Sequence, residues 1–355
     1  MKRIIGLSVL FLLIFALPSL GAQGRLFHYP DVSGNLVAFV YAGDIWTVPL
    51  SGGEARRLTS HVGRELFPKI SPDGKWIAFS GEYSGNRQIY VIPSEGGTPK
   101  QLTFYNDVGE MPTRGGFDNV VLDWTPDSRS IMIRANRTPW GERMGKYFLV
   151  NLEGGLEMPL AIPEAGMGHL SPDGHKVVYT PIERDFRNWK RYKGGRAQDV
   201  WIYDLDKNAS DRITDFPGTD QQPLWIGEKI YFVSDRDLTL NLYTFDLKSR
   251  NVEQVTHFTD ADILWPSGRV NKIVFEKAGE IYLLETETGK VAPLPISLHG
   301  DFPDTLPRFV KTDKFIQSSS LSPTGKRALF EARGDIYSLP EKDGPVVNLT
   351  DTQGV

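Results

Sequence analysis

Few of the side chains that usually carry out chemistry are grouped together in this 355-residue chain. Its six histidines do not pair at the spacing of metal ligands, and His169 and His175 only flank a turn. No serine lies in a Gly-x-Ser-x-Gly motif, and there is no cysteine to supply a thiolate or a disulfide. The sequence therefore predicts no catalytic residue, no bound cofactor and no metal site in this chain.

One acidic segment has the alternate spacing of a calcium-binding loop. Asp204, Asp206 and Asn208 occupy every second position, as oxygen ligands do in such loops. However, Ala209 stands where the loop requires glycine, and position 215 is Asp215 instead of a chelating glutamate. We therefore interpret the segment as an Asp-rich hairpin turn.

The best candidate for a binding role is a basic, aromatic segment from Glu183 to Arg196. Phe186, Trp189 and Tyr192 recur at every third position, so a helical turn would place them on one face. Three roles remain open: packing on a neighbouring blade or domain, contact with a partner domain or subunit, and direct contact with a peptide. The candidate contact residues are Arg184, Arg187, Trp189, Lys190, Arg191, Tyr192, Lys193 and Arg196.

These side chains belong to a chain built from a repeated turn and strand. Ser-Pro-Asp-Gly precedes an apolar strand at 71–74 and 171–174, and related turns occur at 125–128 and 322–325. Proline suits the first central position of such a turn, and Asp and Gly tolerate the backbone that follows. Each unit reads as four short strands, rich in aromatic and β-branched residues and joined by Gly-rich turns.

Four-strand units that recur at roughly 40–50 residues predict a β-propeller. The turns that begin at 71, 125 and 171 are 54 and 46 residues apart. We predict an all-β chain: a six-bladed β-propeller of four-stranded antiparallel blades, followed by the first blade of a second, truncated propeller. A helical solenoid is excluded because no stretch after residue 20 has a 3.6-residue apolar period. A β-sandwich would not explain the repeated strand order.

The predicted boundaries are a signal peptide at 1–22, the ring at 23–297, a proline-containing linker at 298–313 and the start of the second propeller at 314–355. Blades one and six each have four strands of their own. This predicts that the ring closes by side-chain packing alone, with the strand Phe27–Val32 pairing only within blade one. The interface between blades one and six would then open first under stress.

The first 22 residues have the pattern of a cleavable export signal. A basic start is followed by an apolar run from Ile4 to Leu17, which is too short to span a bilayer comfortably. Pro18 ends this run, and Leu20-Gly21-Ala22 is a plausible cleavage site. We expect a periplasmic or secreted protein without stable membrane insertion; an uncleaved anchor is the alternative. Export and the net charge of −4 argue against a nucleic acid as a ligand.

Two strings resemble the amino-terminal part of tricorn-type proteases. They are Phe-Pro-Lys-Ile-Ser-Pro-Asp-Gly at 67–74 and Trp-Lys-Arg-Tyr-Lys-Gly-Gly-Arg-Ala-Gln-Asp-Val-Trp-Ile-Tyr-Asp at 189–204. In that family a six-bladed propeller precedes a seven-bladed propeller, a PDZ-like domain and a serine peptidase core related to carboxy-terminal processing peptidases. Everything catalytic in the family lies beyond the region matched here, so no catalytic role can be carried over to this chain.

The resemblance implies that the chain is the non-catalytic propeller portion of an exported tricorn-like serine protease that degrades oligopeptides. Its roles would be those of a channel or gate and of a domain scaffold. The implied partners are peptides and partner domains or subunits, and the full-length parent is expected to be a homo-oligomer. Two alternatives are a periplasmic protein-binding propeller of the Tol-system type and the propeller of a prolyl-oligopeptidase-like enzyme.

Overall fold

The computed structural model describes residues 26–105, 119–137, 145–182, 190–300, 302, 311 and 313–350. The predicted signal peptide, most of the predicted linker and residues 351–355 lie outside this range. Contacts divide the chain into two units, Met1–His299 and Gly300–Val355. In the described part of the chain, no helix is long and apolar enough to cross a membrane.

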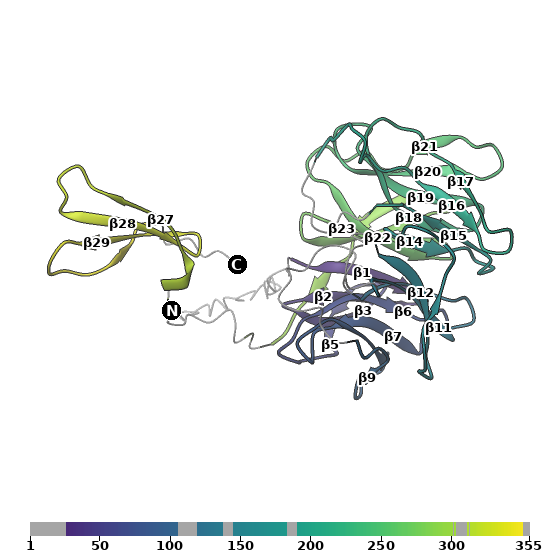
Figure 1. Cartoon of the computed structure of the whole chain (residues 1–355), viewed down its shortest axis with the longest axis horizontal. Helices are drawn as coiled ribbons and strands as arrows, with labels where there is room; N and C mark the ends of the chain where they lie inside the picture. Colours follow the sequence, from purple (N-terminus) through teal and green to yellow (C-terminus); the bar gives the residue numbers. More distant parts are fainter. Residues whose placement is uncertain are drawn as a thin grey trace, which may run out of the picture. The chain divides into compact units, whose positions relative to one another are not determined.

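Unit 1 contains six four-stranded antiparallel sheets within the described residues, which we call blades one to six (Figure 1). In each blade the strands lie side by side in chain order. Blades one to three consist of β1 (His28–Ser33), β2 (Leu36–Tyr41), β3 (Asp44–Pro49), β5 (Arg56–Arg57); β6 (Glu65–Ile70), β7 (Trp76–Gly81), β8 (Gln88–Pro93), β9 (Lys100–Gln101); and β10 (Val120–Trp124), β11 (Ser130–Ala135), β12 (Lys146–Asn151), β13 (Met158–Pro159). Blades four to six consist of β14 (Gly168–Leu170), β15 (Lys176–Tyr179), β16 (Trp201–Asp204), β17 (Ala209–Arg212); β18 (Asp220–Ile226), β19 (Lys229–Ser234), β20 (Asn241–Asp246), β21 (Val252–Gln254); and β22 (Ile263–Arg269), β23 (Lys272–Lys277), β24 (Glu280–Glu285), β25 (Lys290–Pro293).

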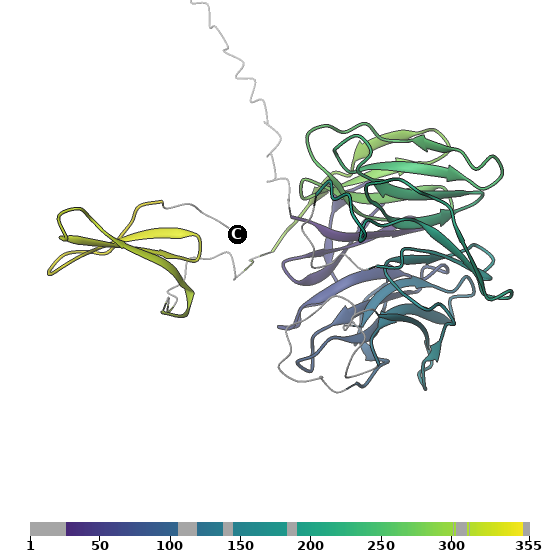
Figure 2. The same cartoon turned by 45° about the horizontal axis from the view of Figure 1, so that its top comes forward.

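The six blades form a closed ring around a common axis. Each first strand contacts the first strand of the next blade, and β1 contacts β22. Figures 1 and 2 show the blades following one another around this ring. Apolar side chains of the second strands fill the space between blades, and Phe39, Phe79, Phe232 and Phe275 are fully buried there. The all-β, repeated four-strand fold predicted from the sequence is confirmed.

The Ser-Pro-Asp-Gly turns join the first and second strands, as predicted. In blade two the Ser71 hydroxyl donates to Asp73 at 2.6 Å and accepts the N–H of Trp76 at 3.0 Å. Gly74 has a φ of 73°, which glycine adopts without steric strain. The repeated phrase therefore supplies both the hydrogen bonds and the backbone freedom of its own turn.

The prediction that the ring closes by side-chain packing alone is wrong. β26 (Ile296–Ser297), which follows blade six, pairs in parallel with β4 (Gly53–Glu54) of blade one. Gly53 N–H donates to Pro295 O at 2.8 Å. The chain leaving blade six can run along the rim of blade one because the glycine turn presents bare backbone to it. Ladder hydrogen bonds therefore join the two ends of the ring.

A second set of contacts closes the ring near the start of β1. β1 pairs only with β2, as predicted. The N–H of Phe27, however, donates to Gly279 O in blade six at 3.0 Å. His28 Nδ1 lies 3.0 Å from Glu276 Oε2 of the same blade. The prediction that this interface opens first under stress assumed that no hydrogen bonds join blades one and six. The structure contradicts that assumption.

Gly52 permits the close approach of the chain that leaves blade six. A Cβ at this position would lie 2.4 Å from Pro295 O. Gly154 occupies the equivalent turn of blade three, also with positive φ, and a Cβ there would meet nothing within 4 Å. We expect Gly52→Ala to lower the free energy of unfolding by about 1–3 kcal/mol more than Gly154→Ala, because only the first substitution forces an overlap. Urea unfolding measures both losses, and equal losses would contradict the assignment.

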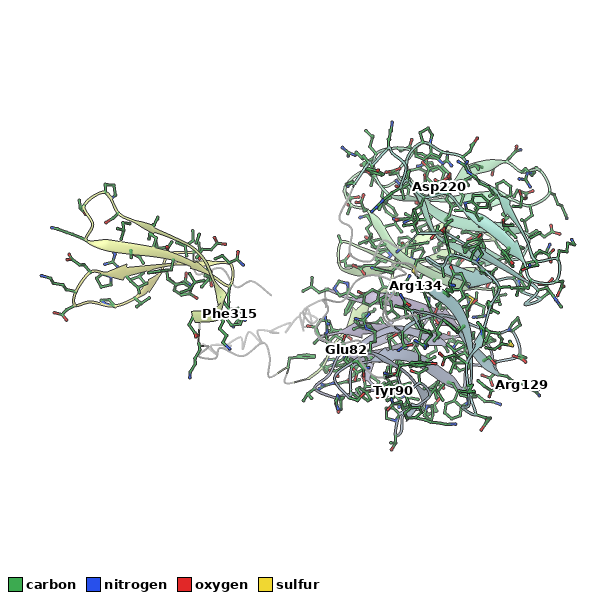
Figure 3. The ribbon with its side chains drawn as sticks, in the orientation of Figure 1. Glu82, Tyr90, Arg129, Arg134, Asp220 and Phe315 are labelled. Atoms are coloured by element: carbon green, nitrogen blue, oxygen red, sulfur yellow. The ribbon has the colours of Figure 1, made fainter. Side chains whose placement is uncertain are left out.

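Unit 2 has the strand order of a single blade. Its strands are β27 (Ile316–Leu321), β28 (Arg327–Ala332), β29 (Asp335–Pro340) and β30 (Val347–Asn348), and they form one antiparallel sheet in that order. A short 3-10 helix, Asp313–Phe315, precedes them, and Figure 3 labels Phe315. The turn at 322–325 joins β27 to β28, as the related turns do in unit 1.

Candidate functional site along the ring axis

The connections between strands differ in length on the two faces of the ring. Because the strands of a blade alternate in direction, turns from first to second and from third to fourth strands share one face, which we call the turn face. All other connections lie on the opposite face, the loop face. The three longest connections within the ring, 102–119, 136–145 and 180–200, leave and rejoin their strands at the loop face. Residues 106–118, 138–144 and 183–189 of these connections lie outside the described residues.

The first strands of five blades contain a β-bulge. The pairing register shifts in β1, β6, β10, β18 and β22. In four of them a residue with positive φ stands directly before a proline, which has no N–H to give to the ladder. These residues are Tyr29, Phe67, Gln222 and Trp265. The bulges change the direction of side chains near the axis, as bulges commonly do.

Three of the bulge residues form an aromatic cluster that joins blades one, two and six. The ring centroid of Tyr29 lies 4.4 Å from that of Phe67 and 4.8 Å from that of Trp265. Phe67 and Trp265 are 5.6 Å apart. First strands run from the loop face to the turn face, and these three residues are the second or third residues of their strands. The cluster therefore lies toward the loop-face end of the axis. Aromatic pairs at these distances add to the stability gained from burial.

An ionic group follows the aromatic cluster along the axis. Lys69 of blade two lies 2.5 Å from Ser267 Oγ of blade six and 3.5 Å from Asp31 Oδ1 of blade one. Asp31 also accepts a hydrogen bond from Ser267. Its other oxygen accepts the N–H of Ile70 at 2.7 Å. Three blades therefore meet at one lysine.

A second ionic group crosses the axis. Arg269 of blade six lies 2.7 Å from Asp123 Oδ1 of blade three, the blade opposite in the ring. Asp123 Oδ2 accepts the N–H of Leu170 at 2.9 Å and lies 3.3 Å from His169 Nδ1 of blade four. We call Asp31, Lys69, Asp123, His169, Ser267 and Arg269 together the axial network.

The charges of the axial network balance at neutral pH. Burial lowers the pKa of His169, so this ring is neutral. Burial alone would raise the pKa of Asp123, but its contacts with His169, with the Arg269 guanidinium and with backbone N–H donors outweigh burial and lower the pKa. Two carboxylates therefore face two cations. The network links first strands of five blades through ion pairs and hydrogen bonds, and its one hydroxyl, that of the buried Ser267, lies between the Asp31 carboxylate and Lys69 Nζ.

The sequence reasoning missed the axial network. Its members come from five blades, and only Ser267 and Arg269 are neighbours along the chain. The sequence does contain a signal for these positions. In several first strands a bulge residue and a proline precede a polar residue, as in Tyr29-Pro30-Asp31 and Phe67-Pro68-Lys69. Phe67-Pro68-Lys69 entered the sequence analysis only as part of the family resemblance.

The basic segment belongs to the connection from β15 to β16, and the structure describes only its residues 190–196. Arg184, Phe186, Arg187 and Trp189 lie outside the described residues. Residues 190–196 form no helix. Arg191 has a positive φ of 57°. Phe186 and Trp189 lie outside the described residues, so their arrangement relative to Tyr192 stays a prediction.

The described part of the basic segment contacts the loops around blade five. Lys190 Nζ lies 2.8 Å from Asp262 Oδ2, and Arg191 Nε donates to Leu238 O at 3.0 Å. Tyr192 is half-buried, whereas Lys193 and Arg196 are exposed. The structure thus brings two of the predicted contact residues onto a neighbouring blade, one of the three roles left open by the sequence.

The acidic segment at 204–208 is a hairpin turn between β16 and β17. Asp204 accepts the N–H of Lys207 at 3.0 Å, and Asp206 lies 3.0 Å from His175 Nδ1. Across the described ranges, no group of three or more His, Cys, Asp or Glu residues is placed to hold a metal ion. The interpretation of this segment as a turn is confirmed.

Glu65 is a buried carboxyl group on the loop-face side of blade two. It is fully buried, and its Oε2 accepts the Thr59 hydroxyl hydrogen at 3.1 Å. Burial raises its pKa to about 8 from 4.5, and nearby Asp44 contributes to the rise. At neutral pH this group is therefore protonated in the folded ring.

The raised pKa of Glu65 predicts a pH-dependent stability. Its contribution is complete below pH 4.5, the ordinary pKa, and is lost as pH rises toward 8. Glu65→Gln cannot ionise, so we expect its unfolding midpoint in urea to fall less between pH 5 and 8 than that of the unmodified chain. Glu95→Gln, at an exposed glutamate of the same blade, is the control. Parallel pH profiles for Glu65→Gln and the unmodified chain would refute the assignment.

Comparison with known proteins places these features in a family context. Residues 24–290 match the family model described as the tricorn protease N-terminal beta propeller domain. The tricorn protease homolog of Saccharolobus solfataricus is 30% identical over 335 residues, which cover 93% of this chain and 30% of that protein. A putative tricorn-like protease N-terminal subunit of Sulfurisphaera tokodaii is 32% identical over 184 residues, covering 51% of this chain and 87% of that protein.

A solved structure has the same fold. The crystal structure of the tricorn protease matches with a TM-score of 0.71 at 24% identity, over 92% of this chain and 31% of that chain. The chain thus spans about 30% of the length of the tricorn protease homologs it matches.

Proposed function

Because this chain belongs to the tricorn protease N-terminal β-propeller family, we propose that it is the non-catalytic propeller portion of a tricorn-like serine protease that degrades oligopeptides. In this proposal the ring has two roles. It holds neighbouring domains in place, and its axis serves as a channel or gate for peptides. The observation that carries the proposal is the family match across the ring, from residue 24 to residue 290.

The axial network supports the gate role. Charged side chains meet on the axis, where a propeller needs only packing residues to hold its blades together. Buried ion pairs are a poor source of stability compared with apolar packing of the same volume. A network of this kind therefore favours a role beyond the stability of the ring.

The proposal extends to location and partners. The signal-like pattern at 1–22 supports export to the periplasm or the cell exterior. The name of the Sulfurisphaera tokodaii relative, an N-terminal subunit, supports partner domains or subunits for this chain. We include a homo-oligomeric full-length protein in the proposal.

The full-length protein from the native reading frame tests the proposal. It should hydrolyse oligopeptides, and a serine-directed inhibitor should abolish the hydrolysis. Purification from the periplasmic or culture fraction tests the export step separately. A folded full-length protein that neither hydrolyses oligopeptides nor reacts with serine-directed inhibitors would overturn the proposal.

The basic segment gives a second test of the proposal. We expect the combined substitution of Arg187, Lys190, Arg191 and Arg196 with alanine in the full-length protein to weaken oligopeptide capture or subunit assembly. The ring should remain folded, because exposed ion pairs contribute only about 0–1 kcal/mol each. The Michaelis constant for oligopeptides and the oligomer size by light scattering are the measurements.

A matched control removes four cations from the turn face. Lys75, Lys207, Lys248 and Arg250 lie in turn-face connections and are exposed. Their combined replacement with alanine should leave both peptide capture and oligomer size unchanged. If the variant of the basic segment behaves like this control, the basic segment only packs on the ring.

A further inference from the structure

The axial network consists of two kinds of group that are held very differently. The carboxylates are fixed by the backbone. Asp31 accepts the N–H of Ile70 at 2.7 Å, and Asp123 accepts the N–H groups of Trp124 at 2.8 Å and Leu170 at 2.9 Å. Their side chains are only 8% and 3% exposed. Moving either carboxylate would break backbone hydrogen bonds in a buried site, which is costly.

The cations are held by side-chain contacts. Lys69 contacts Ser267 and Asp31, and Arg269 contacts Asp123. Their side chains are 16% and 23% exposed, which is more than the carboxylates that face them. Lysine and arginine also have long, flexible stems that can carry the charged group to solvent. Releasing a cation therefore costs less than releasing a carboxylate.

Arg269 has the greater reach across the ring. It extends from the turn-face end of β22 in blade six to Asp123 in blade three, on the opposite side of the axis. Lys69 joins blades one, two and six on one side only. Withdrawal of Arg269 alone therefore removes the contact that crosses the axis.

We propose that the axial network is an ionic gate on the ring axis. In this gate the side chains of Lys69 and Arg269 move, and the carboxylates of Asp31 and Asp123 keep their positions. The gate opens when Arg269 leaves Asp123 and swings toward the turn face, while the carboxylates stay on their backbone donors. This inference deepens the proposed channel role and rests on it for the identity of what passes. The opening itself is a property of the ring.

A thiol reporter measures the opening directly. The chain has no cysteine, so Leu224→Cys introduces a single thiol. Leu224 directly follows Pro223 in β18, just as Asp31 directly follows Pro30 in β1, so the two residues occupy equivalent positions in their blades. Leu224 is only 5% exposed and does not belong to the axial network. The rate of its reaction with a small neutral maleimide reports how often reagent reaches the axis.

We expect Arg269→Met to raise the labelling rate about tenfold, because the methionine keeps much of the length but cannot bind Asp123. Added sodium chloride should raise the rate in the reporter chain that keeps Arg269 and not in the Arg269→Met variant, since salt screens the ion pair. Arg250→Met, at an exposed arginine of the turn face, is the matched control and should leave the rate unchanged. Equal rates for Arg269→Met and the control would overturn the gate.

Hydrogen exchange separates a gate from a structural plug. In Arg269→Met and Lys69→Met, the N–H groups of Ile70 and Leu170 should keep their protection within about twofold, because their carboxylate acceptors stay in place. Loss of protection at both amides in the cation variants would mean that the blades separate. This result would overturn the proposal that the carboxylates keep their positions when the gate opens. Both readouts use the ring itself, so their failure refutes the gate even if the full-length protein hydrolyses oligopeptides, and their success stands if it does not.

Discussion

Asp123→Ala is expected to lower the free energy of unfolding of the ring by about 3–5 kcal/mol, because it removes the acceptor of two buried N–H groups together with the partner of Arg269 in an ion pair. Asp123 is almost completely buried and joins blades three, four and six. Its loss would leave the Arg269 guanidinium and the Leu170 N–H without the acceptor they share. Urea unfolding followed by circular dichroism measures the loss.

Two variants bracket this expected effect. Asp123→Asn keeps an acceptor for Leu170 but removes the charge that Arg269 faces, so its loss should be smaller than that of the alanine variant. Asp73→Ala removes a carboxylate of a solvent-exposed turn in blade two and should cost about 1 kcal/mol or less. An Asp123→Ala ring as stable as Asp73→Ala would show that the axial network does not hold the blades together.

The repeated turns could be predicted from the sequence because each one is encoded locally. Ser71, Asp73 and Gly74 lie within four residues and make one another's hydrogen bonds and backbone geometry. Four such turns, each followed by an apolar strand, made it possible to predict the strand order and hence the repeated four-strand fold. The hairpin at 204–208 was predicted for the same reason, since Asp204 bonds the backbone three residues later.

The axial network could not be predicted in this way because its contacts are not local. Asp123 and Arg269 meet across 146 residues, and Lys69 and Ser267 across 198. Such pairs follow from the number of blades and from the register of each bulge, neither of which a single strand reveals. Only the repeated prolines of the first strands hinted that these positions were special.

The ring closure was missed for a different reason. β26 and β4 are two residues long each, and a two-residue pairing has no periodic pattern. In the sequence, Gly52 and Gly53 indicate only one of the Gly-rich turns between strands. Their second consequence, the space for Pro295, depends on a chain segment more than 240 residues away and could be seen only in the folded ring.

The largest effect on activity is expected from the separation of this chain from the rest of the proposed full-length protein. The isolated 355-residue chain should show no oligopeptide turnover above background, because the proposed function places the serine peptidase core outside residues 1–355. The full-length protein should hydrolyse the same oligopeptides. A repurified chain, free of host peptidases, is the necessary control.

A serine-directed activity probe tests the central claim most directly. The isolated chain and the full-length protein are each treated with the probe, and the labelled residue is located by mass spectrometry. We predict that the isolated chain is not labelled and that the full-length protein carries the label on one serine outside residues 1–355. Labelling of a serine within this chain, accompanied by peptide turnover that survives repurification, would contradict the account of a non-catalytic propeller.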